Sequence, residues 1–445
     1  MPRHLKLASC NTCRQRKLKC DEGLPVCRRC AKARRYCDRS RRPLQLHVFP
    51  AHKDKNQELS ADTPRKALES PEVTIYFQHY INNVARWYDL SDACSLFSTL
   101  VPLIALDEPL LFSAVIALSA IHKSKTNANS ARSAAESFHA QCIRLLIGLD
   151  ANDPLIERGV ALATTCLLRS YEILDEGDDP NRHLKGAFSL VSQYHNLPIH
   201  PSNGLLASGF WNYLREDITF SLFGSCPLKI DLDPVPPLIQ LQSDQDHLNS
   251  ISLILGRIIN VTVGGTTNIP KVVWKMLLDY VDAWYLNLHK QFQPFSRATV
   301  PLLSKLPSVH MLSSCHAAAR HYLLVSYFLL TKCLPSLDQL NELRILVAKI
   351  GIGAVDVADK EDLLEQIALE ICGISFASNE PAVLVNAFGP ISFCARHIRS
   401  EPTQQEVIRH LLASQKSTGW PIQQIIMGLQ GHWGRGGARE FERAS

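Results

Sequence analysis

Residues 10–37 read CNTCRQRKLKCDEGLPVCRRCAKARRYC, and this stretch decides how the N-terminal part of the chain folds. It holds six of the fourteen cysteines in the spacing C-x2-C-x6-C-x6-C-x2-C-x6-C. The spacing is an internal repeat: each half opens with a C-x2-C pair and closes with a third cysteine. Two cysteines three residues apart lie on one face of a helical turn, so both sulfurs can bind one metal ion. The repeat predicts a metal cluster whose ligands are Cys10, Cys13, Cys20, Cys27, Cys30 and Cys37.

Two zinc ions fit this ligand set. Two tetrahedral ions need eight ligand positions, and six thiolates supply them only if two sulfurs each bind both ions. By the symmetry of the repeat, we expect Cys10 and Cys27 to be the bridging ligands. Because so short a segment cannot build a hydrophobic core, zinc should supply its folding free energy, and a chelator should unfold it.

The alternatives to a zinc cluster are a redox dithiol and a disulfide knot. The N-terminus reads MPRHLKLASC, without the apolar stretch of a secretory signal, so we expect the cysteines to lie in a reducing compartment. In such compartments close-set cysteines are more often metal ligands than disulfides. The doubled and evenly spaced pattern therefore favours zinc.

The cysteine repeat lies in a strongly basic segment. Residues 1–43, which we call the basic head, hold 14 Lys and Arg against three Asp and Glu, a net charge of +11, whereas the rest of the chain carries −6. Between Cys13 and Cys20 lies the helix-compatible run RQRKLK, with four cations and one apolar residue. A short basic helix fixed at both ends by metal can enter the major groove of DNA, so we expect double-stranded DNA to be the partner.

The segment from Cys10 to Asp21, followed by LPVCRRC at 24–30, resembles the fungal zinc binuclear cluster (C6 zinc cluster, Zn2Cys6) transcription factors. In that family the first helix of the cluster reads a short CGG-like triplet in the major groove. The resemblance implies that Lys17 contacts a base, with Arg16 beside it, since a cation can donate to guanine O6 and N7. The cations expected to contact phosphates are Arg14, Lys19, Arg28 and Lys32.

Residues 44–70 read as a flexible linker, because they are polar, contain prolines at 50 and 64 and show no apolar period. Many members of the family follow the cluster with a dimerising coiled coil, but no heptads occur here. Monomeric binding and dimerisation through the larger domain therefore both stay open. Arg39, Arg41 and Arg42 add a basic patch suited to phosphate contact or nuclear import.

Residues 71–445 predict a large all-α domain. Ser70-Pro71 is a good helix start, and apolar residues follow to Tyr88 at spacings of three and four. The nearly all-apolar segment from Pro109 to His122 should be a central core helix. Further helices are predicted at 130–149, 155–175, 181–195, 205–223, 245–262, 270–290, 308–333, 356–372, 380–398, 404–416 and 421–430, and no strands are predicted.

Parts of this domain also resemble a known family, the fungal-specific transcription factor domain in its shorter variety. The blocks that carry the resemblance are Tyr76-Phe77 to Trp87-Tyr88-Asp89, ALSAIH at 117–122, WNYLREDI at 211–218 and TGWP at 418–421. In that family the helical region is regulatory. The resemblance thus implies a small Zn2Cys6 binuclear cluster module followed by a large all-α regulatory domain, acting in the nucleus on RNA polymerase II transcription and its machinery.

An enzyme is not expected, since the sequence contains no H-E-x-x-H, Walker-type or G-x-S-x-G motif. No membrane-spanning segment is expected either, because the longest apolar run, 110–121, is far shorter than about 20 residues. The other eight cysteines read as buried structural thiols, and His122, His316 and His397 as packed or surface residues. A metabolite-binding protein with a zinc head and a non-specific nucleic-acid scaffold are the remaining alternatives. In having a compact domain and no coiled coil, the chain resembles regulators of fungal secondary-metabolite or nutrient-use genes.

Overall fold

A computed structural model of the chain forms two compact units, residues 1–58 and 59–445, which are described separately. We call the second the helical unit. The residues that the structure describes are 12–13, 20–21, 27–33, 35, 63–126, 131–176, 181–194, 197–232, 243–263, 269–298, 306–336, 338–352 and 359–444. The first unit contains helix α2 (Arg28–Lys32), which begins directly after Cys27.

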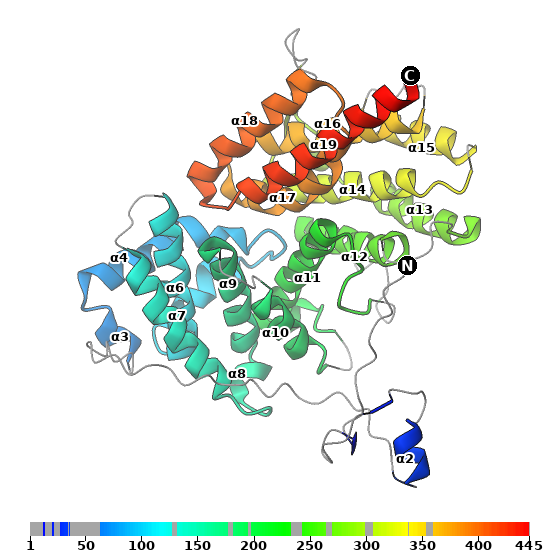
Figure 1. Cartoon of the computed structure of the whole chain (residues 1–445). Coiled ribbons are helices and arrows are strands. Elements are labelled where there is room, and N and C mark those ends of the chain that lie inside the picture. The colour runs from blue at the N-terminus through cyan, green and yellow to red at the C-terminus, as the bar shows by residue number, and fades with distance from the viewer. Residues whose placement is uncertain are drawn as a thin grey trace. The chain divides into compact units, whose positions relative to one another are not determined.

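The helical unit is built almost entirely of helices (Figure 1). In its first half these are α3 (Pro64–Ala67), α4 (Pro71–His79), η1 (Tyr80–Val84), η2 (Ala85–Trp87), α5 (Leu96–Ala105), α6 (Pro109–Thr126), α7 (Arg132–Ile147), α8 (Pro154–Glu157), α9 (Val160–Asp175), α10 (Arg182–Val191), η4 (Pro201–Asn203) and α11 (Leu205–Gly224). The second half contains α12 (Asp244–Thr262), α13 (Lys271–Leu286), η5 (Lys290–Phe292), α14 (Ser314–Lys332), α15 (Asp338–Lys349), α16 (Lys360–Ala377), α17 (Pro381–Cys394), η7 (Ala395–His397), α18 (Glu401–Thr418) and α19 (Gln423–Ala444).

Two helices form the centre of the core. Every residue of α6 from Leu110 to His122 is buried, and α7 and α9 pack against it (Figure 1). In the second half, α14 is buried from Cys315 to Thr331 and packs against α12, α16 and α17. A helix that is apolar on all faces must be covered on all faces, so the prediction that α6 is central is confirmed.

Helix α11 joins the two halves of the helical unit. It contacts α9 on one side and α12 and α17 on the other. The backbone comes very close where α11 meets the start of α9: a Cβ on Gly159 would lie 2.3 Å from the Leu206 nitrogen. Gly159 also has a φ of +77°, so glycine is required there for both its conformation and its size.

The prediction of an all-α domain is confirmed in outline, and most predicted helices are present within a few residues. The predicted helix from Pro71 to Tyr88 is interrupted, because α4 ends at His79 and continues as the π-turn η1 and the 3-10 turn η2. Three α-helices of the helical unit were not predicted: α3, α5 and α15. The predicted linker also ends earlier than expected, since Arg65 of α3 pairs with Asp107 at 2.8 Å and Ala67 is buried.

The structure contains a short ribbon that was not predicted. Strands β1 (Ser296–Ala298) and β2 (Ser308–His310) pair antiparallel, with Arg297 opposite Val309. The Arg297 guanidinium lies 2.8 Å from the buried Glu370 carboxylate on α16 and so fixes the ribbon to the helices. Among the described residues, no helix is long and apolar enough to cross a membrane.

Candidate metal centre

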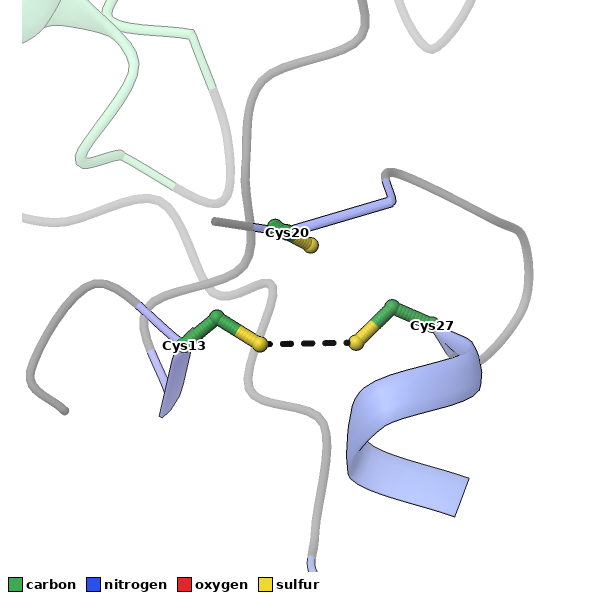
Figure 2. A group of neighbouring side chains, drawn as sticks. All are labelled: Cys13, Cys20 and Cys27. Atoms are coloured by element: carbon green, nitrogen blue, oxygen red, sulfur yellow. Dashed lines mark hydrogen bonds between the residues drawn. The ribbon is translucent and has the colours of Figure 1, made fainter. Parts of the chain in front are cut away.

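Three cysteines from different parts of the repeat meet in the first unit. The Sγ atoms of Cys13, Cys20 and Cys27 all lie within 4.8 Å of one another, and Figure 2 shows the Cys13 and Cys27 side chains pointing toward each other. Cys27 is fully buried and Cys13 is 2% exposed. In the part of the chain that the structure describes, this is the one group of three or more metal-binding side chains close enough to share an ion.

The distances between the sulfurs fit shared zinc ligands. Cys13 Sγ lies 3.6 Å from Cys27 Sγ and 3.9 Å from Cys30 Sγ. A disulfide bond would bring two sulfurs to about 2.05 Å, so neither pair is joined by a disulfide. Two thiolates about 2.3 Å from one tetrahedral zinc lie about 3.8 Å apart. The cluster therefore has both the donor type and the spacing that zinc requires.

The second C-x2-C pair is arranged by the start of α2. Cys27 is the N-cap of this helix, and its Sγ accepts a hydrogen bond from the backbone N–H of Cys30 at 3.4 Å. The helical turn directs both sulfurs to the buried side, since Cys30 is only 1% exposed. Because Cys27 lies next to both Cys13 and Cys30, its sulfur is in contact with both halves of the repeat.

Asp21 connects the two halves of the repeat, a role that could not be predicted from the sequence. The Asp21 carboxylate accepts hydrogen bonds from the backbone N–H groups of Arg28 at 3.0 Å and Arg29 at 3.3 Å. It therefore caps α2, although it lies seven residues before the helix, directly after Cys20. An acidic residue adjoining a ligand cysteine in so basic a segment was the available signal, but its partner could not be identified without the fold.

The outer side of α2 is cationic. Arg28, Arg29 and Lys32 are all exposed, and so is Arg35 after the helix. Exposed cations on a short, capped helix are available to a phosphate backbone. Of the predicted site residues, Cys10, Cys37, Arg14, Arg16, Lys17 and Lys19 lie outside the described residues.

The remaining cysteines and the three histidines belong to the helical unit. Five cysteines are buried there, and burial raises the pKa of Cys372, for example, to about 12. Cys94 differs from the expected buried thiol, because it is exposed in a turn before α5, and Cys226 and Cys333 are only half-buried. The histidines have protein partners: His122 bonds to His79, His316 to Asp244 and His397 to Glu361.

Two domain families match the chain. Residues 8–46 match the fungal Zn(2)-Cys(6) binuclear cluster domain, and residues 75–214 match the fungal specific transcription factor domain. Each of these two segments is thus similar to a domain of fungal transcription factors. The binuclear cluster domain binds two zinc ions, and Cys13, Cys20, Cys27 and Cys30 gather in this protein as that chemistry requires. Neither matched domain is an enzyme domain.

A further similarity covers a short part of the chain. The transcription activator AMTR1 of Alternaria alternata is 36% identical to it over 90 residues. The match covers 20% of this chain and 11% of the relative, so the chain aligns with about a tenth of that protein's length. No solved structure matches the chain.

Proposed function

We propose that this protein is a zinc-dependent, sequence-specific DNA-binding transcription factor that regulates RNA polymerase II transcription. The observation that carries the proposal is the gathering of Cys13, Cys20 and Cys27 beneath the capped cationic helix α2. Zinc bound there would fold a segment too small to have its own core, and the cations around it would meet the DNA phosphates. The matches to two transcription factor domain families support the same function.

The proposed ligand set comprises all six cysteines of the repeat, with Cys10 and Cys27 bridging the two ions. The position of Cys27 supports its role, because its sulfur lies 3.6 Å from Cys13 and accepts the Cys30 N–H. Cys13 is the competing candidate, since it lies 3.9 Å from Cys30 as well. The symmetry of the repeat favours Cys27, which is equivalent in the second half to Cys10 in the first.

The proposed DNA contacts divide into two classes. Lys17, with Arg16 beside it, would donate to a guanine of a CGG-like triplet in the major groove, as the family resemblance implies. Arg14, Lys19, Arg28 and Lys32 would contact phosphates and set the register of the head on the duplex. The exposure of Arg28 and Lys32 on α2 supports this second class.

The proposed division of labour follows the chain. Residues 1–43 bind DNA, the segment before α3 forms the tether, and the helical unit passes a cellular signal to the transcriptional machinery. The family is generally nuclear, and the basic patch Arg39, Arg41 and Arg42 supports nuclear import. We propose a secondary-metabolite or nutrient-use gene set as the target, on the resemblance to compact regulators that lack a coiled coil.

Selection from a random DNA pool with the full chain tests the proposed function. It would be run with zinc and again with a chelator, and the enriched sequences compared. We expect a CGG-containing site to be enriched only with zinc, and one or two triplets would distinguish a monomer from a dimer. No enrichment under either condition would contradict sequence-specific binding.

A further inference from the structure

A small cavity lies inside the helical unit. It has a volume of about 30 Å³ and lies where η2, α9, α11 and α17 meet. Since a cavity needs about 10 to 15 Å³ to hold one water molecule, this one has room for two or three non-hydrogen atoms. That is the size of a carboxylate. Its wall includes Trp87, Arg215, Glu216 and Asn386.

Arg215 on α11 is the unusual member of this wall. Arg215 is only 6% exposed. Its Nη2 donates a hydrogen bond to the neutral Asn212 Oδ1. Its Nη1 is buried and has no hydrogen-bond partner among the described residues. A buried guanidinium normally requires a paired anion, because burial removes its hydration. Burial accordingly lowers the pKa of Arg215.

The adjacent charges leave this region positive. The nearest acidic wall residue, Glu216, pairs with Arg169, whose Nε lies 3.5 Å from its carboxylate. In the described part of the unit, no carboxylate oxygen lies within 4.0 Å of the Arg215 guanidinium. Two buried guanidinium groups are thus matched by one carboxylate. One further negative charge would balance them.

Two more buried donors on the cavity wall lack partners. They are Trp87 Nε1 on η2 and Asn386 Nδ2 on α17, and neither finds an acceptor among the described residues. Buried N–H groups are almost always hydrogen-bonded, so each unpaired donor requires an explanation. With Arg215 Nη1, three donors from three separate elements line one cavity, and the same wall carries one buried acceptor without a hydrogen bond, Glu216 Oε2. The unpaired donors therefore outnumber the unpaired acceptors.

We propose that this cavity binds a small carboxylate anion, with Arg215, Asn386 and Trp87 donating hydrogen bonds to its oxygens. A carboxylate supplies acceptors for all three donors and the one negative charge that the region lacks. The proposal goes beyond DNA binding and concerns a ligand site in the helical unit. The competing occupant is water, which would satisfy the donors but not the charge.

Thermal unfolding of the full chain, titrated with sodium acetate at constant ionic strength, tests the proposal. Acetamide serves as the neutral molecule of the same shape. We expect acetate to raise the melting temperature with a saturable dependence on its concentration, and acetamide to have no such effect. A rise that is linear and equal for both molecules would reflect general solvent effects, and would overturn the proposal.

The variant Asn386→Asp tests the proposed carboxylate site most directly. It keeps an oxygen to accept the Tyr322 hydroxyl, which lies 3.1 Å from Asn386 Oδ1, and it places a carboxylate on the cavity wall. We expect it to weaken acetate binding by at least about tenfold, because the new carboxylate removes one donor and itself supplies the negative charge that acetate would supply. Arg215→Met should weaken binding similarly, and Asn386→Asp preserves the test if the methionine variant does not fold.

Arg409→Met is the matched control. Arg409 lies on α18 with its side chain 71% exposed, and its removal should leave the acetate response unchanged. The same saturable response in Asn386→Asp as in Arg409→Met would overturn the proposed site. The measurement uses no DNA, so its failure would leave the proposed DNA binding untouched.

Discussion

The Asp21 carboxylate accepts the backbone N–H of Arg28 at 3.0 Å, and so the residue after the third cysteine caps the helix that follows the fourth. The hydrogen bond connects the two halves of the cysteine repeat through the chain itself. A capped helix start helps to hold the N-cap Cys27, and Cys30 three residues later, in the positions that the ions require. Metal affinity should therefore depend on a residue that is not a ligand.

We expect Asp21→Ala to weaken zinc binding about tenfold. The substitution removes two charge-assisted hydrogen bonds at a helix N-terminus, a loss of about 1 to 2 kcal/mol. Folding of the head is coupled to metal binding, so this loss should appear as reduced zinc affinity in competition with a chromophoric chelator. Glu22→Ala makes the same change of net charge at the next position and is the control. Equal affinities for the two variants would argue against the capping role.

Cys27→Ser should release both zinc ions, because the proposed bridge serves both. Native mass spectrometry of the full chain would count the ions directly, with two expected for the unmodified protein. Cys94→Ser is the control, since Cys94 is an exposed thiol of the helical unit and its loss should leave two ions bound. Retention of two zinc ions by Cys27→Ser would rule out the bridging assignment.

The two classes of DNA contact should respond differently to substitution. Lys17→Ala should lose about 1 to 3 kcal/mol of discrimination at one guanine of the site. Arg28→Ala should weaken binding to all sequences by a similar factor. It should also lower the slope of log affinity against log salt concentration by about one. Fluorescence anisotropy with the selected duplex and single-base variants, at several salt concentrations, measures both. If the two substitutions gave the same pattern, the assignment of Lys17 to a base would be wrong.

Acid should destabilise the helical unit through its buried histidines. Burial lowers the pKa of His321 on α14 to about 4, against about 6.5 in an unfolded chain. Its Nε2 lies 3.0 Å from the neutral Ser375 hydroxyl, which cannot stabilise an imidazolium by charge. Between about pH 6.5 and 4 the unfolded state binds the extra proton, so stability falls as the pH is lowered through this window. At pH 5 the loss from this residue is about 2 kcal/mol.

Denaturant unfolding of His321→Gln at several pH values would isolate this contribution. The free energy of unfolding should depend less steeply on pH in this variant between 6.5 and 4. His200→Gln removes an exposed histidine and should keep the original slope. Asp89, whose pKa burial raises to about 6, acts in the opposite direction, so the comparison of slopes is the informative measurement. Identical slopes in both variants would contradict the neutral buried state of His321.

The long amphipathic and apolar helices could be predicted from the sequence because their patterns are local. Helix α6 is apolar almost throughout, and α4 begins at Ser70-Pro71 as predicted. Helix α5 was missed because it contains Pro102, which normally ends a helix, and follows a left-handed Ser95. Its start is stabilised by Asp89, which accepts the backbone N–H of Phe97 at 3.0 Å across eight residues.

The ligand cysteines could likewise be predicted, since their spacing alone identifies them. Their supporting contacts could not, because these depend on how the repeat folds back on itself. Asp21 caps a helix seven residues away. The wall of the carboxylate cavity brings Trp87 together with Asn386, which are almost three hundred residues apart in the chain. Such pairings follow from tertiary packing and leave no local pattern.

Binding of the full chain to a CGG duplex, before and after removal of zinc, tests the proposed function most directly. The titration would use the selected duplex and one with a guanine of the triplet replaced, first with zinc, then with a chelator, then with zinc restored. We predict tight binding to the selected duplex only, loss of binding on chelation, and recovery with zinc. Equal affinity for both duplexes, or binding unaffected by chelation, would contradict a zinc-dependent reader of DNA sequence.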